Sequence, residues 1–117
     1  MVRRVDVVIL EMLRSIAWIE DDTCGMSREI FQNRRVTQQL VERNIEIISE
    51  ASRRIPDHMK LAHPLVPWRS IAGIGNVLRH DYHDIRANII WDIVVSELPA
   101  LKVALEAILQ EPNIGKS

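Results

Sequence analysis

Apolar residues recur every three or four positions along most of this chain, a spacing that places them on one face of an α-helix. The pattern is clearest over residues 2–19 and 36–54, where charged residues fill the other positions, and it predicts two long amphipathic helices. Between them, Gly25 is suited to a C-terminal cap. Ser27 is suited to the N-cap of a short helix that runs to Gln32.

The stretch 55–69 contains three prolines and predicts an ordered loop with at most one helical turn, at residues 58–61. Helix resumes near Pro67, because a proline at the first helical position has no hydrogen bond to lose. The buried face of this next helix is expected to carry Ile71, Ile74, Val77 and Leu78.

The last third of the chain predicts two further helices. Asp84 is suited to cap the first, and Ser96 is suited to cap the second, where Pro99 fits in the first turn. We expect the tail from about residue 111 to fray. The pattern as a whole predicts a single all-α domain over residues 1–117, an antiparallel bundle of four to five helices.

Composition agrees with this fold and limits the function. Apolar residues make up 47% of the chain and aromatic residues only 4%, a balance that suits helices packed through Leu, Ile and Val. The formal charge of -1 excludes a generally basic coat, so any contact with RNA or DNA must be focal. Cys24 is the single cysteine, which indicates a reducing compartment. No run of about 18 uncharged apolar residues is present, so we expect a soluble, cytoplasmic protein without a membrane partner.

Ionisable residues gather at positions 78–86, beside apolar residues typical of a buried helix. Because a charged group removed from water must be paired or neutralised, this cluster requires a solvated turn or a chemical role. His80 and His83 lie three apart, on one face of a helix, but they are too few to bind zinc, so we expect no metal. No nucleophile elbow and no dinucleotide-binding loop is present.

Acid–base chemistry without a cofactor remains. Histidine titrates near neutrality and arginine holds a phosphate oxygen, so the two together suffice to cleave RNA through its own 2′-hydroxyl. The structural alternative is that His80 and Tyr82 cap the helix end and form hydrogen bonds across the bundle. Spacing alone leaves both interpretations open.

The run PWRSIAGIGNVLRHDY, residues 67–82, resembles the signature of the HepT family, HEPN-superfamily toxins with the pattern PWR-x-I-x-G-x-R-N-x-L-x-H-x-Y. Residues 34–51 and 89–102 resemble the family's second long helix and its closing helices, so the likeness covers nearly the whole chain. It implies a HEPN-like helical ribonuclease that acts as a homodimer, with the two motifs in a shared cleft. It also implies a minimal nucleotidyltransferase antitoxin, which silences the toxin of this type VII system by transferring AMP to the motif tyrosine.

Carried over position by position, His80 matches the motif histidine and Tyr82 the tyrosine that receives AMP. Asn76 matches the asparagine that follows the motif arginine, but the arginine itself is replaced by Gly75. A missing guanidinium costs several kcal/mol of transition-state stabilisation, by analogy with an oxyanion donor. We therefore expect an attenuated ribonuclease.

Other charged residues are candidates for auxiliary roles. Arg79 and Arg69 lie close to the motif in sequence, although Arg79 and His80 diverge by about 100 degrees on a helix, which argues against a simple replacement of the arginine. On the second long helix, Arg43, Glu46 and Glu50 either line the cleft and orient the catalytic arginine or histidine, or form ordinary surface ion pairs. Two arginine pairs, Arg34 with Arg35 and Arg53 with Arg54, either form a patch for RNA phosphates or belong to a solvated face.

Two non-catalytic alternatives remain open. Without its arginine, the same fold would serve as a subunit that binds a nucleotidyltransferase or a nucleotide and cleaves nothing. It would otherwise serve as a structural dimerisation module. The enzyme needs His80 for turnover, whereas neither alternative does.

Overall fold

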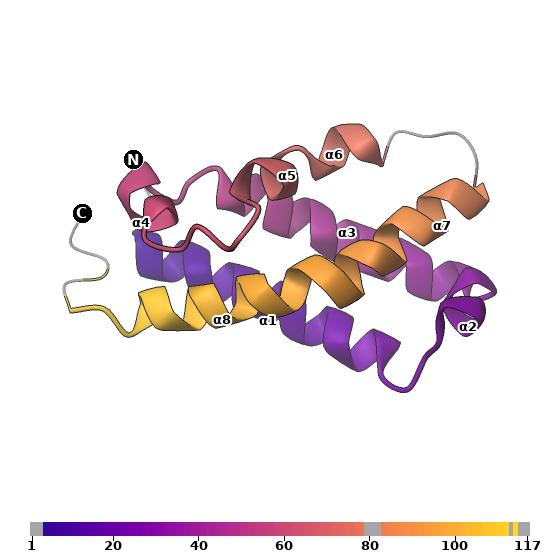
Figure 1. Ribbon diagram of the computed structural model, residues 1–117. Coiled ribbons are helices and arrows are strands. Elements are labelled where there is room, and N and C mark those ends of the chain that lie inside the picture. Colours follow the sequence, from indigo (N-terminus) through magenta and orange to yellow (C-terminus); the bar gives the residue numbers. More distant parts are fainter. Residues whose placement is uncertain (1–3, 79–82, 113, 115–117) are drawn as a thin grey trace.

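The computed structural model describes residues 4–78, 83–112 and 114, and within these ranges all regular structure is helical, which confirms the all-α prediction. The elements follow one another as a helical bundle (Figure 1). They are α1 (Val5–Thr23), α2 (Arg28–Gln32), α3 (Arg35–Ser52), α4 (Asp57–Leu61), α5 (Trp68–Ala72), α6 (Ile74–Val77), α7 (His83–Asp92), the π-helix η1 (Ile93–Glu97) and α8 (Leu98–Leu109).

The two long helices predicted by periodicity are α1 and α3, which run antiparallel and pack along their lengths (Figure 1). Their connection follows the predicted signals. Gly25 has φ of 75°, a conformation that glycine adopts without strain, just after the end of α1. The Ser27 hydroxyl accepts a hydrogen bond of 3.2 Å from the Ile30 amide and so caps α2.

The closing helices differ from the prediction. We expected Asp84 and Ser96 to cap two separate helices, but α7, η1 and α8 follow one another without a break from residue 83 to 109. Asp84 lies inside α7, and Ser96 lies inside η1. Pro99 has no N–H to donate to the Val95 carbonyl, and the wider π-helical turn directly before it accommodates this missing bond.

The helix expected to resume near Pro67 is divided into two short pieces. Pro67 is the residue before α5 and not its first helical residue, and the chain turns at Gly73 before α6 begins. The Gly73 amide donates to the Arg69 and Ser70 carbonyls, which ends α5. Val77 was expected on the buried face, but it is 44% exposed.

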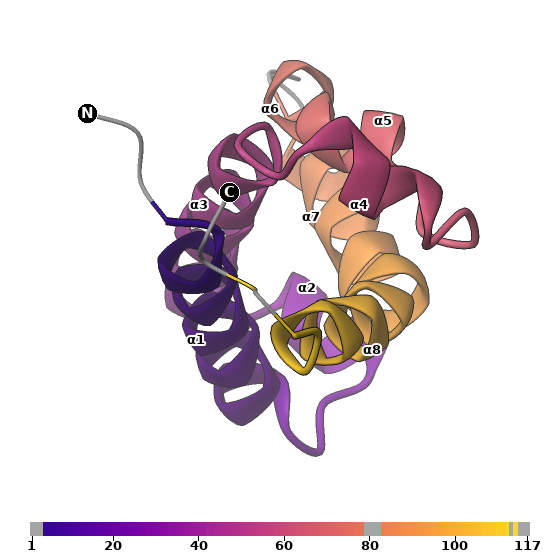
Figure 2. The ribbon, with the colours of Figure 1, turned by 90° about the vertical axis from the view of Figure 1, so that its left-hand side faces the viewer.

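The apolar faces of these helices meet in one core. Seen along the bundle, α1 and α3 lie on one side, α7 and α8 lie on the other, and α4 to α6 cover the top (Figure 2). Phe31 of α2 is fully buried, and its ring centroid lies 5.3 Å from that of Trp91 on α7. Gln32 and Arg28 donate to the Asn88 side-chain oxygen at 2.6 and 3.0 Å, which fixes α2 to α7 at the surface of the bundle.

Two glycines of this fold have opposite conformational requirements. Gly25→Ala should lower the free energy of unfolding by about 1 kcal/mol, because φ is positive there. Gly75→Ala should raise it by roughly 0.5–1 kcal/mol, since Gly75 is helical and an added Cβ meets no atom within 4 Å. Urea unfolding of the two variants and the parent chain measures both changes, and equal signs would contradict this account.

Candidate functional site

Only part of the predicted motif lies within the residues that the structure describes. Gly75 and Asn76 lie on α6. Arg79, His80 and Tyr82 lie outside the described residues. The first part of the motif therefore lies on α6, and its surroundings are defined by the helices that α6 contacts.

A polar groove of about 300 Å³ lies between α3 and α6, beside the position of the family's arginine. Among the described residues, no atom outside its chain neighbours and its own helix backbone lies within 4 Å of a Cβ built on Gly75, so there is room for a Cβ at this position. We call this the α3–α6 groove. Its lining residues are Glu46, Ser49, Glu50, Arg53, Gly75, Asn76 and Leu78.

Ion pairs on α3 border the groove. Glu50 contacts two guanidinium groups, those of Arg53 at 3.4 Å and Arg54 at 3.8 Å. Arg43 lies 3.6 Å from Glu46. Of the charged candidates in this region, Glu46, Glu50 and Arg53 therefore line the groove, whereas Arg43 reaches it only through Glu46.

The Ala72 carbonyl at the end of α5 fastens this part of the site to α3. It accepts a hydrogen bond of 2.7 Å from Arg53 Nη2 and one of 3.1 Å from the Ser49 hydroxyl. The last carbonyls of a helix have no partner within the helix, so these two donors satisfy one of them. Because α6 begins two residues later, the same bonds hold Gly75 opposite the charged face of α3.

A second polar contact lies further along α3. Glu42 Oε1 is 3.7 Å from the Arg86 Nε of α7, beside a small cavity of about 80 Å³. Burial raises the pKa of the Glu42 carboxyl, the Arg86 charge opposes this rise, and the nearby Glu46 adds to it. Glu42 and Ser49 were not among the site residues predicted from the sequence. The spacing of positions 42, 46, 49 and 53, which lie along one face of a helix, would have indicated both residues.

Arg69 does not line the α3–α6 groove. It lines a separate depression of about 580 Å³ formed by α4, α5 and the loop between them. Trp68 lies in the same place, where its indole N–H donates to the Lys60 and His63 carbonyls at 3.1 Å. Trp68 thus serves to hold the proline-rich loop against the bundle, as expected for a packing residue.

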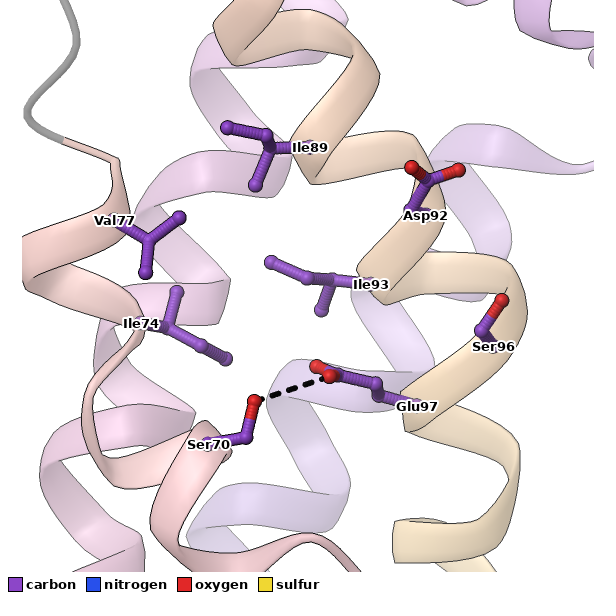
Figure 3. Close-up of a pocket in the computed structure, with 8 residues that line it drawn as sticks. All are labelled: Ser70, Ile74, Val77, Ile89, Asp92, Ile93, Ser96 and Glu97. Carbon is purple, nitrogen blue, oxygen red and sulfur yellow. Dashed lines mark hydrogen bonds between the residues drawn. The ribbon is translucent and has the colours of Figure 1, made fainter.

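An apolar groove of about 240 Å³ runs between α5–α6 and α7–η1, on the other side of α6 (Figure 3). Ser70 donates to Glu97 at 3.2 Å across one end of this groove. Its apolar lining residues are Ile74, Val77, Ile89 and Ile93.

Within residues 4–78, 83–112 and 114, no group of three or more His, Cys, Asp or Glu side chains is arranged to hold a metal ion. In the same ranges, no helix is both long and apolar enough to cross a membrane.

Comparisons with known proteins identify the family of this chain. The family model described as "Ribonuclease HepT-like" matches residues 12–108. A Thermococcus cleftensis protein named "Probable ribonuclease HepT" is 35% identical over 96 residues, which cover 82% of this chain and 87% of that protein. A Caldanaerobacter subterraneus protein is 32% identical over 100 residues, covering 86% of this chain and 89% of its own.

A Methanocaldococcus jannaschii protein is 32% identical over 103 residues, which cover 88% of this chain and 85% of that protein. The names of this protein and of the Caldanaerobacter relative both begin "Putative RNase". No solved structure is a significant match. The family match spans most of the chain and contains the whole motif region, so this chain belongs to the HepT-like ribonuclease family.

Proposed function

We propose that this chain is a metal-independent RNA endonuclease and the toxin of a toxin–antitoxin pair in the cytoplasm. The observation that carries the proposal is the α3–α6 groove, a polar groove of about 300 Å³ at the first part of the family's motif. In the proposed reaction, His80 takes the proton of an RNA 2′-hydroxyl, whose oxygen attacks the adjacent phosphorus. The bond to the 5′-oxygen breaks, and this leaving oxygen receives a proton.

Gly75 makes this enzyme weaker than one with the family's arginine. An arginine at this position would place a guanidinium in the groove, where it would stabilise charge on the phosphate during cleavage. The open space at Gly75 supports this account, because a Cβ added there meets no atom of the described residues within 4 Å apart from its own helix backbone and chain neighbours.

Three chains test the motif: the parent, Gly75→Arg, and Gly75→Arg combined with His80→Ala. We expect Gly75→Arg to raise cleavage of single-stranded RNA by on the order of 10²-fold, the effect of one oxyanion donor. The added His80→Ala change should abolish this gain. Gel analysis of RNA cleaved in the presence of a chelator measures both effects and controls for contaminating metal-dependent nucleases.

Gly75 also favours a second function, that of a non-catalytic subunit bound to a nucleotidyltransferase or a nucleotide. This alternative predicts that neither the parent chain nor Gly75→Arg cleaves RNA. Cleavage by Gly75→Arg that survives His80→Ala would instead contradict the assigned role of the histidine.

The proposed antitoxin is a minimal nucleotidyltransferase that transfers AMP to Tyr82. The described residues include no phosphate-binding loop, and the chain carries no sequence motif for one, so the partner must supply the ATP site. Incubation with such a partner and ATP should add the mass of one adenylate, and Tyr82→Phe should prevent the addition. A mass gain on Tyr82 with this chain and ATP alone would overturn the proposed division of roles.

We further propose a homodimer in which a second copy covers the face formed by α6 and α7. Val77, which lies within the motif in sequence, and Ile85, three residues after it, are 44% and 46% exposed. Exposed apolar side chains are typical of interfaces, and a second copy there would bring the two motifs close to one another.

Sedimentation tests this arrangement. The parent chain should sediment as a dimer, and Val77→Lys should shift it to the monomer because it places a charge in the interface. Val103→Lys is the matched control, since Val103 is 68% exposed on α8, away from this face. An equal effect of both substitutions would place the interface elsewhere.

A further inference from the structure

We propose that Arg53, directly after the last residue of α3, supplies the guanidinium that contacts RNA phosphate in place of the missing motif arginine. The inference rests on the proposed ribonuclease function and assigns the residual activity of this chain to a residue outside the motif. The ligand class is a phosphodiester of single-stranded RNA, held in the α3–α6 groove.

Arg53 is the one arginine among the described residues that line this groove together with Gly75 and Asn76. Its Nη2 atom donates to the Ala72 carbonyl, three residues before Gly75, at 2.7 Å. The side chain is thus anchored next to the position from which the motif arginine would extend. The groove that Arg53 lines together with Gly75 and Asn76 has a volume of about 300 Å³, which leaves room for a phosphate group.

The Arg53 guanidinium has N–H donors left for a ligand. Arginine has five N–H donors in a planar group, and the bonds from Arg53 to Ala72 and Glu50 use two of them. The Arg53 side chain is 55% exposed, so an anion reaches it from solvent. A planar guanidinium fixed by two bonds matches the geometry of a phosphate group better than a mobile ammonium would.

The charges around the groove permit an anion despite its two glutamates. Glu46 is paired with Arg43, and Glu50 is shared by two arginines. The ion-pair network as a whole holds three guanidinium groups against two carboxylates, and Arg53 is the member of it that presents a positive charge in the groove itself. A neutralising contact with one phosphate completes the balance.

Arg54 offers a matched control for Arg53. It carries the same charge and contacts the same carboxylate, at 3.8 Å from Glu50, but it does not line the groove. The two exposed fractions are similar, 48% for Arg54 and 55% for Arg53. A general loss of positive charge on α3 would therefore affect both substitutions alike, whereas a specific phosphate contact would affect only one.

The experiment compares Arg53→Gln, Arg54→Gln and the parent chain in two assays. The first measures cleavage of single-stranded RNA. The second measures the salt dependence of binding to a 2′-O-methylated oligonucleotide, which has no 2′-hydroxyl to attack. We expect Arg53→Gln to lower cleavage at least tenfold and to reduce the slope of log Kd against log salt by about 0.7, the loss of one single-strand phosphate contact. Arg54→Gln should change cleavage by less than about twofold and should leave the slope equal to that of the parent chain.

Adding Gly75→Arg to Arg53→Gln distinguishes a phosphate contact by Arg53 from a purely structural role of this residue. We expect the new arginine to restore both cleavage and the salt slope, because it delivers a guanidinium to the same groove. If Arg53 only held α5 in place through Ala72, an arginine at position 75 would restore neither, and this result would overturn the proposal. Equal losses from Arg53→Gln and Arg54→Gln would also overturn it.

The two proposals fail in different ways. If neither the parent chain nor Gly75→Arg cleaves RNA, the ribonuclease function is wrong. The binding slopes with the 2′-O-methylated oligonucleotide then still decide whether Arg53 contacts phosphate. If the chain cleaves but the slopes of Arg53→Gln and the parent are equal, the Arg53 assignment alone is wrong.

Discussion

Helix α3 contributes both to the core and to the α3–α6 groove, and this constrains the rest of the structure. One face of this helix carries Val41, Ile45 and Ile48, which are completely buried or nearly so and belong to the core. A second face carries the charged residues that meet α5, α6 and α7. Since α3 contacts α1, α2, α5, α6 and α7, a shift of this helix would disturb the core and the α3–α6 groove together. Burial of the apolar face thus determines where the charged face lies.

Elements defined by local chemistry could be predicted from the sequence. The spacing of apolar residues predicted α1 and α3, and Gly25 and Ser27 marked the turn between α1 and α2, because backbone conformation and capping depend on adjacent residues. Pro99 lies in the first turn of α8, as predicted, but the break expected before this helix is absent. Ser96 has the residue type of an N-cap, yet it lies inside a π-helical turn that joins α7 to α8.

The groove could not be predicted in the same way, because it depends on which helix lies opposite α3. The charged positions on α3 were visible in the sequence, and Arg53 was recognised as a possible phosphate contact or a solvated residue. Only the bonds from α3 to the Ala72 carbonyl place Gly75 against these charges. The same packing sends Arg69 to the other side of α5, although it is closer to the motif in sequence.

The π-helical turn has a consequence for the length of the chain. Buried residues along α7 and α8 are separated by three or four positions, but Ile93 and Leu98, on either side of the turn, are separated by five. The turn thus absorbs one additional residue while both flanking segments keep the same face toward the core. A sequence with a residue fewer at this point would reach the same surface through an ordinary α-helical turn. Insertion or deletion of that single residue therefore leaves the same residues of both flanking segments facing the core.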